Sequence, residues 1–246
     1  MLPEAVAALR ALGVRIDASG AFPFDAIRFC DAGSSATAAI VSGQAYGLRR
    51  AALHKLLVER AAELGVQFSW GAHVTELGSD HLRTTGERIS FRWLVAADGQ
   101  NSVVRKWVGL NPRRRFHSRF GFRRHYAVAP WNRCVEVHWG ERCQMFVTPT
   151  AAEEVCVALL SNDPLMRIER ALAQFPEVAT RLRCARTITQ EAGAVSVLGR
   201  ARAVVRRNVA LVGDASCAID GIAGKGLSLA FQQALALGAA FAPENT

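Results

Sequence analysis

The stretches LVAADGQNSVVR at residues 94–105 and VALVGDAS at residues 209–216 decide the fold. Each begins with a short, continuously apolar run, which is typical of a strand that is covered on both faces of a parallel sheet. Each run ends at an acidic residue beside a glycine, Asp98 in the first stretch and Asp214 in the second. Because ligands of open parallel sheets bind beyond the carboxyl ends of the strands, both carboxylates are expected on the rim of one ligand site.

Helices are predicted around these strands by the spacing of apolar residues. Residues 2–12 carry a proline at a helix-starting position, and residues 48–64 have the most regular helical spacing in the chain. Residues 164–183 are also expected to be helical, with a break at Pro176. An apolar helix over residues 225–241 follows a glycine-rich loop near the end of the sequence.

Strands are predicted between these helices. Alternating segments that suit an antiparallel sheet with one wetter face lie at residues 120–128, 134–139, 143–147 and 155–160. A hairpin or meander is expected within residues 27–41, and short strands are expected at residues 66–70, 73–77 and 89–92.

This order of elements predicts an α/β protein, α+β overall. A Rossmann-like nucleotide-binding domain is expected to be discontinuous and to consist of residues 1–112 and 195–246. Residues 113–194 are expected to form an inserted antiparallel-sheet domain that binds the substrate.

Charge and composition narrow the function classes. Half of the 246 residues are hydrophobic and 21% are charged, which excludes a disordered chain. The 30 Lys and Arg exceed the 21 Asp and Glu, so the net charge is +9, with basic stretches at residues 113–125 and 200–207. Neither stretch carries a nucleic-acid-binding motif, so the expected partner is a small molecule and not nucleic acid. Nucleic-acid binding through residues 113–124 remains an alternative, which predicts salt-dependent retention on DNA or RNA.

The first basic stretch contains Arg119, Arg123, Arg124 and His125, for which two interpretations stay open. These side chains attract an acidic substrate or the phosphates of NADPH, or they form a solvated face of a sheet.

Targeting and metal signals are absent from the sequence. No run of about 18 apolar residues occurs, and the N-terminus lacks a signal-peptide pattern, so a cytoplasmic protein without a membrane span is expected. The six cysteines form no C-x-x-C pair and no zinc-ligand spacing; they are interpreted as small buried hydrophobes, and no metal site is expected.

Three motifs in order carry a family resemblance. The first stretch resembles ADGxxSxVR, the second together with GIAGKGL at residues 221–227 resembles vGDAa…GxG before a helix, and YGLRRAAL at residues 46–53 resembles an R-x-x-L helix start with Arg50 as the arginine. These motifs are similar to those of the FAD-dependent monooxygenase and oxidoreductase superfamily, of the para-hydroxybenzoate hydroxylase and geranylgeranyl reductase type. The resemblance implies that the discontinuous domain binds FAD.

The resemblance also implies cofactor-binding residues, while no catalytic acid or base is named. The set is Arg50, Asp98, Gly99, Gly213, Asp214, Ala215, Gly224, Lys225, Gly226 and Leu227. Asp214 would accept hydrogen bonds from the ribityl hydroxyls, since ionised acceptors bind more strongly than neutral ones. The helix after Gly226 would point free amides at the pyrimidine edge of the flavin. Asp98 and Gly99 would lie beside the pyrophosphate and the substrate cleft, and Arg50 near the phosphates or the ring.

Three further residues have open roles. Lys225 either helps to hold negative charge near the reduced ring or is a solvated loop lysine. Arg105 either belongs to the site or pairs with an acid. Cys217 stands where many hydroxylases of the family carry a histidine, and it is interpreted as an inert buried thiol.

The implied activity is that of an FAD-dependent oxidoreductase. Flavin reduced by NADH or NADPH would activate oxygen or reduce a double bond of a small or lipophilic organic substrate. The sequence departs from the family because it contains no G-x-G-x-x-G and is expected to start partway along the family pattern. An upstream segment or a second chain would then complete the sheet. The alternative is a truncated relative that acts as a non-catalytic binding or assembly module.

Overall fold

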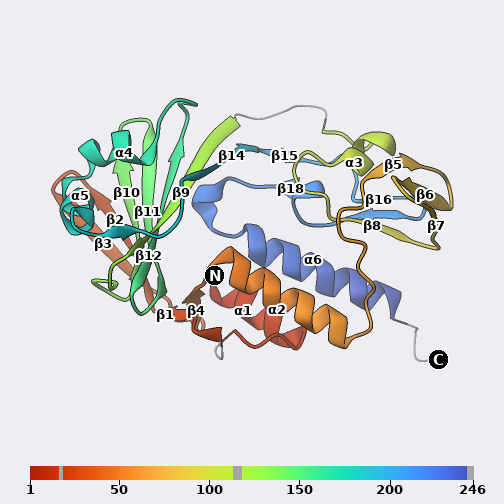
Figure 1. Ribbon diagram of the computed structural model, residues 1–246, viewed down its shortest axis with the longest axis horizontal. Helices are drawn as coiled ribbons and strands as arrows, with labels where there is room; N and C mark the ends of the chain where they lie inside the picture. The colour runs from red at the N-terminus through yellow and green to blue at the C-terminus, as the bar shows by residue number, and fades with distance from the viewer. Residues whose placement is uncertain (17–18, 113–117, 243–246) are drawn as a thin grey trace.

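The computed structural model describes residues 1–16, 19–112 and 118–242. It is a mixed α/β structure, as predicted, with a large sheet at one end and a layer of helices beside several small sheets at the other (Figure 1). Residues 113–117 of the basic stretch lie outside the described residues. No helix of the described part is both long and apolar enough to cross a lipid bilayer.

The large sheet contains all four predicted antiparallel segments. Its order is β13 (Arg186–Thr187), β9 (Ser118–Ala127), β12 (Glu154–Ser161), β11 (Cys143–Ala151), β10 (Cys134–Gly140), β2 (Ala26–Asp31) and β3 (Ser34–Ala39), and β14 (Ala192–Val197) also pairs with β9. The β2–β3 hairpin confirms the expectation for residues 27–41. Since β2 joins β10 in parallel register, the sheet extends beyond residues 113–194. The expected division into domains stays a prediction.

Helices cover one face of this sheet. Three short elements confirm the helical prediction and its break at Pro176: α4 (Ile168–Ala171), η2 (Leu172–Gln174) and α5 (Pro176–Leu182). They pack on alternate side chains of the strands, including Met145, Val157 and Leu159, to form the largest apolar core. Cys184 is exposed in the turn after α5, so the expectation that the thiols are buried is wrong there.

A second core lies among the three long helices. These are α1 (Pro3–Ala11), α2 (Arg50–Glu63) and α6 (Gly226–Phe241), which confirm the three helical predictions. Leu9 of α1, Leu53 of α2 and Phe231 of α6 belong to one apolar cluster, so the three helices form a single layer (Figure 1). The small sheet of β1 (Phe22–Phe24) and β4 (Ala45–Gly47) joins this layer to the large sheet.

Small sheets complete the fold. The two apolar runs that precede Asp98 and Asp214 form β8 (Leu94–Ala96) and β17 (Val209–Leu211), which pair in parallel. The strand β16 (Val205–Arg206) pairs with the other edge of β17. The others are β5 (Val74–Leu77), β6 (His81–Thr84), β7 (Arg88–Ser90), and the pair β15 (Gly199–Arg200) with β18 (Cys217–Ala218). The connecting helices are α3 (Val103–Trp107), η3 (Gly213–Ala215) and η4 (Gly221–Ala223).

Two strand predictions near these sheets are wrong. Residues 66–70 form no strand, and the rings of Phe68 and Trp70 stack on each other with centroids 5.2 Å apart. The expectation that β8 is covered on both faces also fails, because Val95 is 42% exposed. The reason is position: β8 is the last strand of its sheet, whereas β17 lies between two neighbours and is buried throughout.

The start of α2 is fixed against the large sheet. A Cβ atom on Gly47 would fall 1.6 Å from the carbonyl oxygen of Pro149, so only glycine permits this approach of β4 to β11. Two residues later, Arg49 binds the carboxylate of Glu154 with two nitrogens, and its Nε donates at 2.6 Å. The hydroxyl of Thr150 donates to the same carboxylate at 2.8 Å.

Replacement of Glu154 with Gln tests this contact. Burial acts to raise the pKa of Glu154, but the hydrogen bonds from Arg49 and Thr150 lower it below its ordinary value of 4.5. The Gln variant should therefore be less stable by about 2 kcal/mol at neutral pH. The ionised carboxylate stabilises the fold, and this contribution is lost as Glu154 becomes protonated. The difference in stability between wild type and variant should therefore shrink as the pH falls below 4.5.

Chemical denaturation across pH measures this difference. Glu76→Gln is the control, because Glu76 and its partner Arg83 are both more than half exposed, and its effect should stay below about 0.5 kcal/mol. An equal loss in both variants, or a pH-independent loss in Glu154→Gln, would refute the role given to the Arg49–Glu154 pair.

Candidate cofactor and substrate site

Parallel pairing of β8 with β17 brings the two motif loops together. Ala96 is the partner of Leu211, and the amide of Val212 donates to the carbonyl of Ala96 at 3.0 Å. Both strands therefore end at the same edge of their sheet, and the loops that follow them start side by side.

Arg105 links these two loops. It lies on α3, is only 9% exposed, and donates to the carbonyl of Ala215 at 2.8 Å, of Asp214 at 3.4 Å and of Gln100 at 2.5 Å. The hydroxyl of Ser102, which caps α3, accepts from the Arg105 amide at 2.9 Å. The observed contacts thus attach the arginine to backbone carbonyls of both loops.

The two predicted carboxylates differ in their surroundings. Asp98 accepts hydrogen bonds from the amides of Val103 at 2.8 Å and Val104 at 3.1 Å, so it caps the start of α3. Asp214 is exposed, and across residues 1–16, 19–112 and 118–242 no protein group donates to its carboxylate. A hollow of about 270 Å³ is lined by Asp214 and by Gln100 of the first loop, and Asp98 is not part of its wall.

The second loop is held from behind by α6. Gly213 has a φ of +59°, which favours glycine, and its amide donates to Oε1 of Gln233 at 2.6 Å. The hydroxyl of Ser216 donates to the same oxygen at 3.0 Å. Ala215 is fully buried, so its contribution is to packing and to the bond with Arg105. Gln233 is absent from the predicted set because no local motif marks it.

The glycine-rich loop leads directly into α6. Asp220 accepts from the amide of Ile222 at 3.1 Å and pairs with Arg119 of β9 at 3.3 Å. Gly224, with a φ of +61°, then turns the chain toward Gly226, where α6 begins.

The first turn of α6 offers hydrogen-bond donors. Its first amides, from Gly226 onward, have no partner within the helix. The hydroxyl of Ser228 is buried and has no hydrogen-bond partner within the part of the chain that the structure describes. The ammonium of Lys225 instead binds Glu4 of α1 at 3.3 Å.

Arg50 is the first residue of α2 and remains exposed. Partial removal from solvent lowers the pKa of its guanidinium, the nearby charge of Arg123 lowers it further, and Asp214 acts in the opposite direction. Arg50 therefore experiences the charges of both Asp214 and Arg123. Of the predicted residues, the structure thus brings Asp214, Arg50 and the start of α6 to one region, and it gives Asp98 a capping role.

An apolar cavity adjoins this region. Its volume is about 690 Å³, and the glycine-rich loop at residues 221–224 forms part of its wall. The opposite wall is the inner face of the large sheet, with the apolar side chains of Ile27, Phe29, Val135, Val137 and Phe146, and Phe24 of β1 extends it. Arg123 is the single charged side chain in the described lining.

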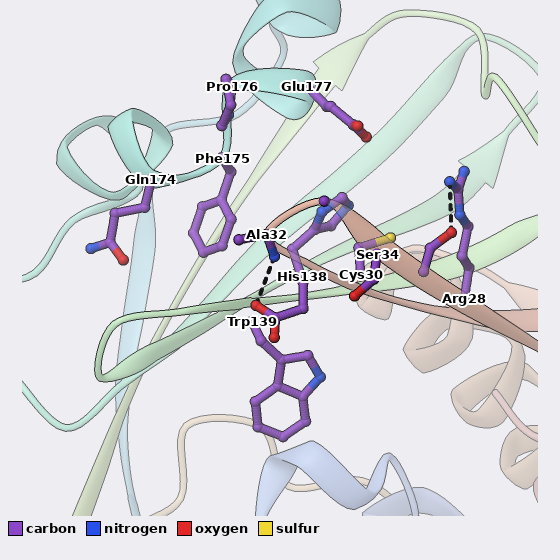
Figure 2. A pocket seen from close by; sticks show the side chains of 13 residues that line it. Arg28, Cys30, Ala32, Ser34, His138, Trp139, Gln174, Phe175, Pro176 and Glu177 are labelled. Atoms are coloured by element: carbon purple, nitrogen blue, oxygen red, sulfur yellow. Dashed lines mark hydrogen bonds between the residues drawn. The ribbon is translucent and has the colours of Figure 1, made fainter.

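A separate hollow lies on the opposite face of the large sheet, on the side of α4 and α5 (Figure 2). Its volume is about 310 Å³, and Arg28, Cys30 and His138 line it beside Phe175 of the helical layer. Residues next to them in sequence line the large cavity, and successive side chains of a strand point to opposite faces. Neither motif loop contributes to this hollow, so it is separate from the candidate site.

Substitution of Arg105 tests the link between the loops. Arg105→Met removes bonds from a buried guanidinium to three carbonyls, so unfolding free energy should fall by about 3 kcal/mol. Amide hydrogen exchange should rise together in residues 100–102 and 213–216. The neighbouring Lys106→Met, at an exposed position, should change neither. Faster exchange in only one loop would show that Arg105 does not couple them.

Comparison with known proteins agrees with this geometry. No curated protein matches the chain, whereas many solved structures do. A flavin-dependent brominase, Bmp2, as a triple mutant, superposes with a TM-score of 0.84 at 18% identity, covering 98% of this chain and 69% of that one. CmlS, a flavin-dependent halogenase, gives 0.85 at 19% identity and coverage of 98% and 50%.

PqsL from Pseudomonas aeruginosa, described as a probable FAD-dependent monooxygenase, gives a TM-score of 0.79 at 18% identity and coverage of 98% and 74%. The chain thus spans from half to about three-quarters of the length of these three structures. The family model described as FAD binding domain matches residues 31–245. The FAD-binding resemblance seen in the three motifs is confirmed: the chain belongs to the FAD binding domain family, whose cofactor is FAD.

Proposed function

We propose that the protein is an oxidoreductase that uses FAD, is reduced by NADH or NADPH, and acts as a monooxygenase or reductase on a small apolar organic substrate. The observation that carries the proposal is the apolar cavity of about 690 Å³, which shares the loop at residues 221–224 with the start of α6. A cavity of this size is within the usual range for small-molecule sites. A substrate bound there would lie next to the loop at residues 221–224, to which the motif resemblance assigns a role in cofactor binding.

The residues of this region fit FAD. Asp214 has a free, exposed carboxylate that would accept hydrogen bonds from ribityl hydroxyls. The first amides of α6 and the unpaired Ser228 hydroxyl would donate to the polar edge of the flavin ring. Arg50 would contribute positive charge near Asp214.

Bound FAD would supply the redox chemistry, and the protein would orient the substrate and exclude water. Arg123 is the one charged side chain among the described lining residues. The side chains of this cavity therefore bind and position a substrate. The apolar walls keep the reacting groups away from solvent.

FAD titration of the purified chain tests the proposal. Loss of the ionised acceptor in Asp214→Asn should weaken FAD binding about tenfold, as judged by quenching of flavin fluorescence. Asp80→Asn, at a carboxylate that is 74% exposed on another sheet, is the control and should bind FAD like the wild type. A folded wild-type chain that does not bind FAD would instead favour a non-catalytic binding module.

We also propose that the outer edge of β8 pairs with a strand of a second copy of the chain. The amide of Leu94 donates to the carbonyl of Asn208, just before β17, and the carbonyl of Ala96 accepts from the amide of Val212, just after β17. The backbone groups of Val95 therefore point away from β17, to the open side. Val95 and the adjacent Trp93 are 42% and 43% exposed. An open apolar strand edge favours pairing with another strand.

Replacement of Val95 with Lys tests this edge. If the edge is a pairing surface, the variant should self-associate less than the wild type in sedimentation velocity. Its melting temperature should be unchanged, because an exposed substitution alters stability by less than about 0.5 kcal/mol. Val41→Lys is the control, because Val41 is 94% exposed and lies away from β8. A wild type as monomeric as the variant would contradict the proposal.

A further inference from the structure

A buried histidine and glutamate lie together on the helical side of the large sheet. His138 is 6% exposed, and its Nε2 atom is 3.1 Å from Oε2 of Glu136, which lies two residues earlier on β10. Both side chains point to the same face of the sheet, since they are two residues apart on a strand. Of the two, His138 belongs to the described lining of the hollow on this face (Figure 2).

The carboxylate of Glu136 fixes the position of the hydrogen on the imidazole. Burial acts to raise the pKa of Glu136, but hydrogen bonds from His138, Asn132 and Trp131 lower it below its ordinary value of 4.5, so the carboxylate is ionised at neutral pH. An ionised carboxylate only accepts hydrogen bonds, so Nε2 of His138 carries the hydrogen. In the neutral ring, Nδ1 is then a hydrogen-bond acceptor.

This acceptor is open to the hollow. Within residues 1–16, 19–112 and 118–242, no protein group donates to Nδ1 of His138, and the atom is not sealed off from solvent. A largely buried acceptor without a partner is unfavourable until a donor reaches it. The hollow of about 310 Å³ is the space from which such a donor would come.

Two carboxylates on the wall of the hollow favour a donor with positive charge. Asp31 ends β2 and Glu177 lies in the first turn of α5; both are exposed, and neither forms a salt bridge within the described part of the chain. Figure 2 shows the side chain of Glu177 reaching from α5 toward the strands. Burial raises the pKa of the Cys30 thiol and the charge of Glu177 acts in the same direction, so the thiol stays neutral and the carboxylate lies near it.

The positive charge in the described lining is already engaged. Arg28 donates to the hydroxyl of Ser35 at 3.2 Å, and its guanidinium lies 3.7 Å from the carboxylate of Glu136. Its charge is therefore offset behind the wall, while the charges of Asp31 and Glu177 face the hollow. An anion would meet these two carboxylates, whereas a cation would be attracted to them.

Aromatic residues complete the lining. Phe175 packs edge-on to the ring of His138 with centroids 6.1 Å apart, and Trp139 is 43% exposed beside it. Aromatic faces attract ammonium groups and also cover an apolar body. A primary ammonium group has three N–H donors and no acceptor, which matches an imidazole acceptor together with carboxylates. In the described part of the chain, no three His, Cys, Asp or Glu side chains are placed to hold a metal ion instead.

We propose that the hollow between β2, β10 and α5 binds a small primary amine in its ammonium form. Nδ1 of His138 and the carboxylate of Glu177 accept its hydrogen bonds, and Phe175 and Trp139 surround its apolar body. The volume of about 310 Å³ is at the lower end of the range for small-molecule sites, so the ligand is small. The site lies on the face of the sheet opposite the apolar cavity, and the inference does not depend on the proposed FAD-dependent function.

Calorimetric titration of the whole chain at pH 8, where histidine is ordinarily neutral, tests the proposal. Benzylamine, 2-phenylethylamine and hexylamine are each compared with the alcohol that carries the same body. Nα-acetyl-lysine amide represents the other source of a primary ammonium group, a lysine side chain of a protein. At least one of the three amines should bind about tenfold more tightly than its alcohol, because the alcohol lacks the charge and two of the donors.

Two variants remove separate parts of the site. His138→Gln supplies an amide donor for Glu136 but removes the acceptor from the hollow, and Glu177→Gln removes the carboxylate. Each should weaken binding of the amine about tenfold. Because Glu177 is exposed, its variant should keep the melting temperature of the wild type, so it decides the outcome if His138→Gln does not fold.

Glu153→Gln is the matched control. Glu153 is an exposed carboxylate between β11 and β12 and is not part of the described lining of the hollow, so the variant changes the net charge equally and should bind the amine like the wild type. No binding of any probe, equal binding of each amine and its alcohol, or undiminished amine binding in Glu177→Gln would each overturn the proposal. Tighter binding of the lysine amide than of all three amines would overturn the assignment to a small molecule.

Discussion

Parallel pairing of β8 with β17 is the constraint on which the candidate site depends. The two strands are far apart in sequence, and their pairing makes both motif loops leave one edge of the same sheet. The guanidinium of Arg105 then links the loops by donating to carbonyls of each. Burial of this cation is tolerated because several backbone oxygens replace the water that it loses.

The position of the cavity follows from three further contacts. The close approach at Gly47 and the ion pair of Arg49 with Glu154 dock the start of α2 on the large sheet. At the other side, Arg119 of the sheet pairs with Asp220 of the glycine-rich loop. These contacts hold the helical layer and the glycine-rich loop against the large sheet, whose inner face lines the cavity.

Local sequence patterns were sufficient for the long helices and for the antiparallel strands, because apolar periodicity depends mainly on which face a segment buries. They were insufficient where a neighbour in space decides the outcome. The run at β8 has the composition of a buried strand, yet Val95 is exposed at the end of its sheet. The pairing of β2 with β10 joins segments that no local pattern connects.

The residues of the candidate site also divide into those that local motifs predict and those that depend on neighbours in space. Asp214 and the glycine-rich loop could be found from motifs; residues 221–224 of that loop form part of the wall of the apolar cavity, and Asp214 lines the neighbouring hollow with Gln100. The capping role of Asp98 could not, since the same residue type and spacing suit either a ligand or a helix cap. Gln233 had no local signal, because its contact with Gly213 depends on how α6 packs.

The central claim is that the Asp214 loop and the first turn of α6 form one FAD site facing the apolar cavity. Amide hydrogen exchange of the wild-type chain, with and without FAD, tests this claim most directly. The account predicts that FAD slows exchange together in residues 213–216 and in residues 226–228. No slowing in either segment, or slowing confined to the separate hollow of Arg28 and Phe175, would contradict it.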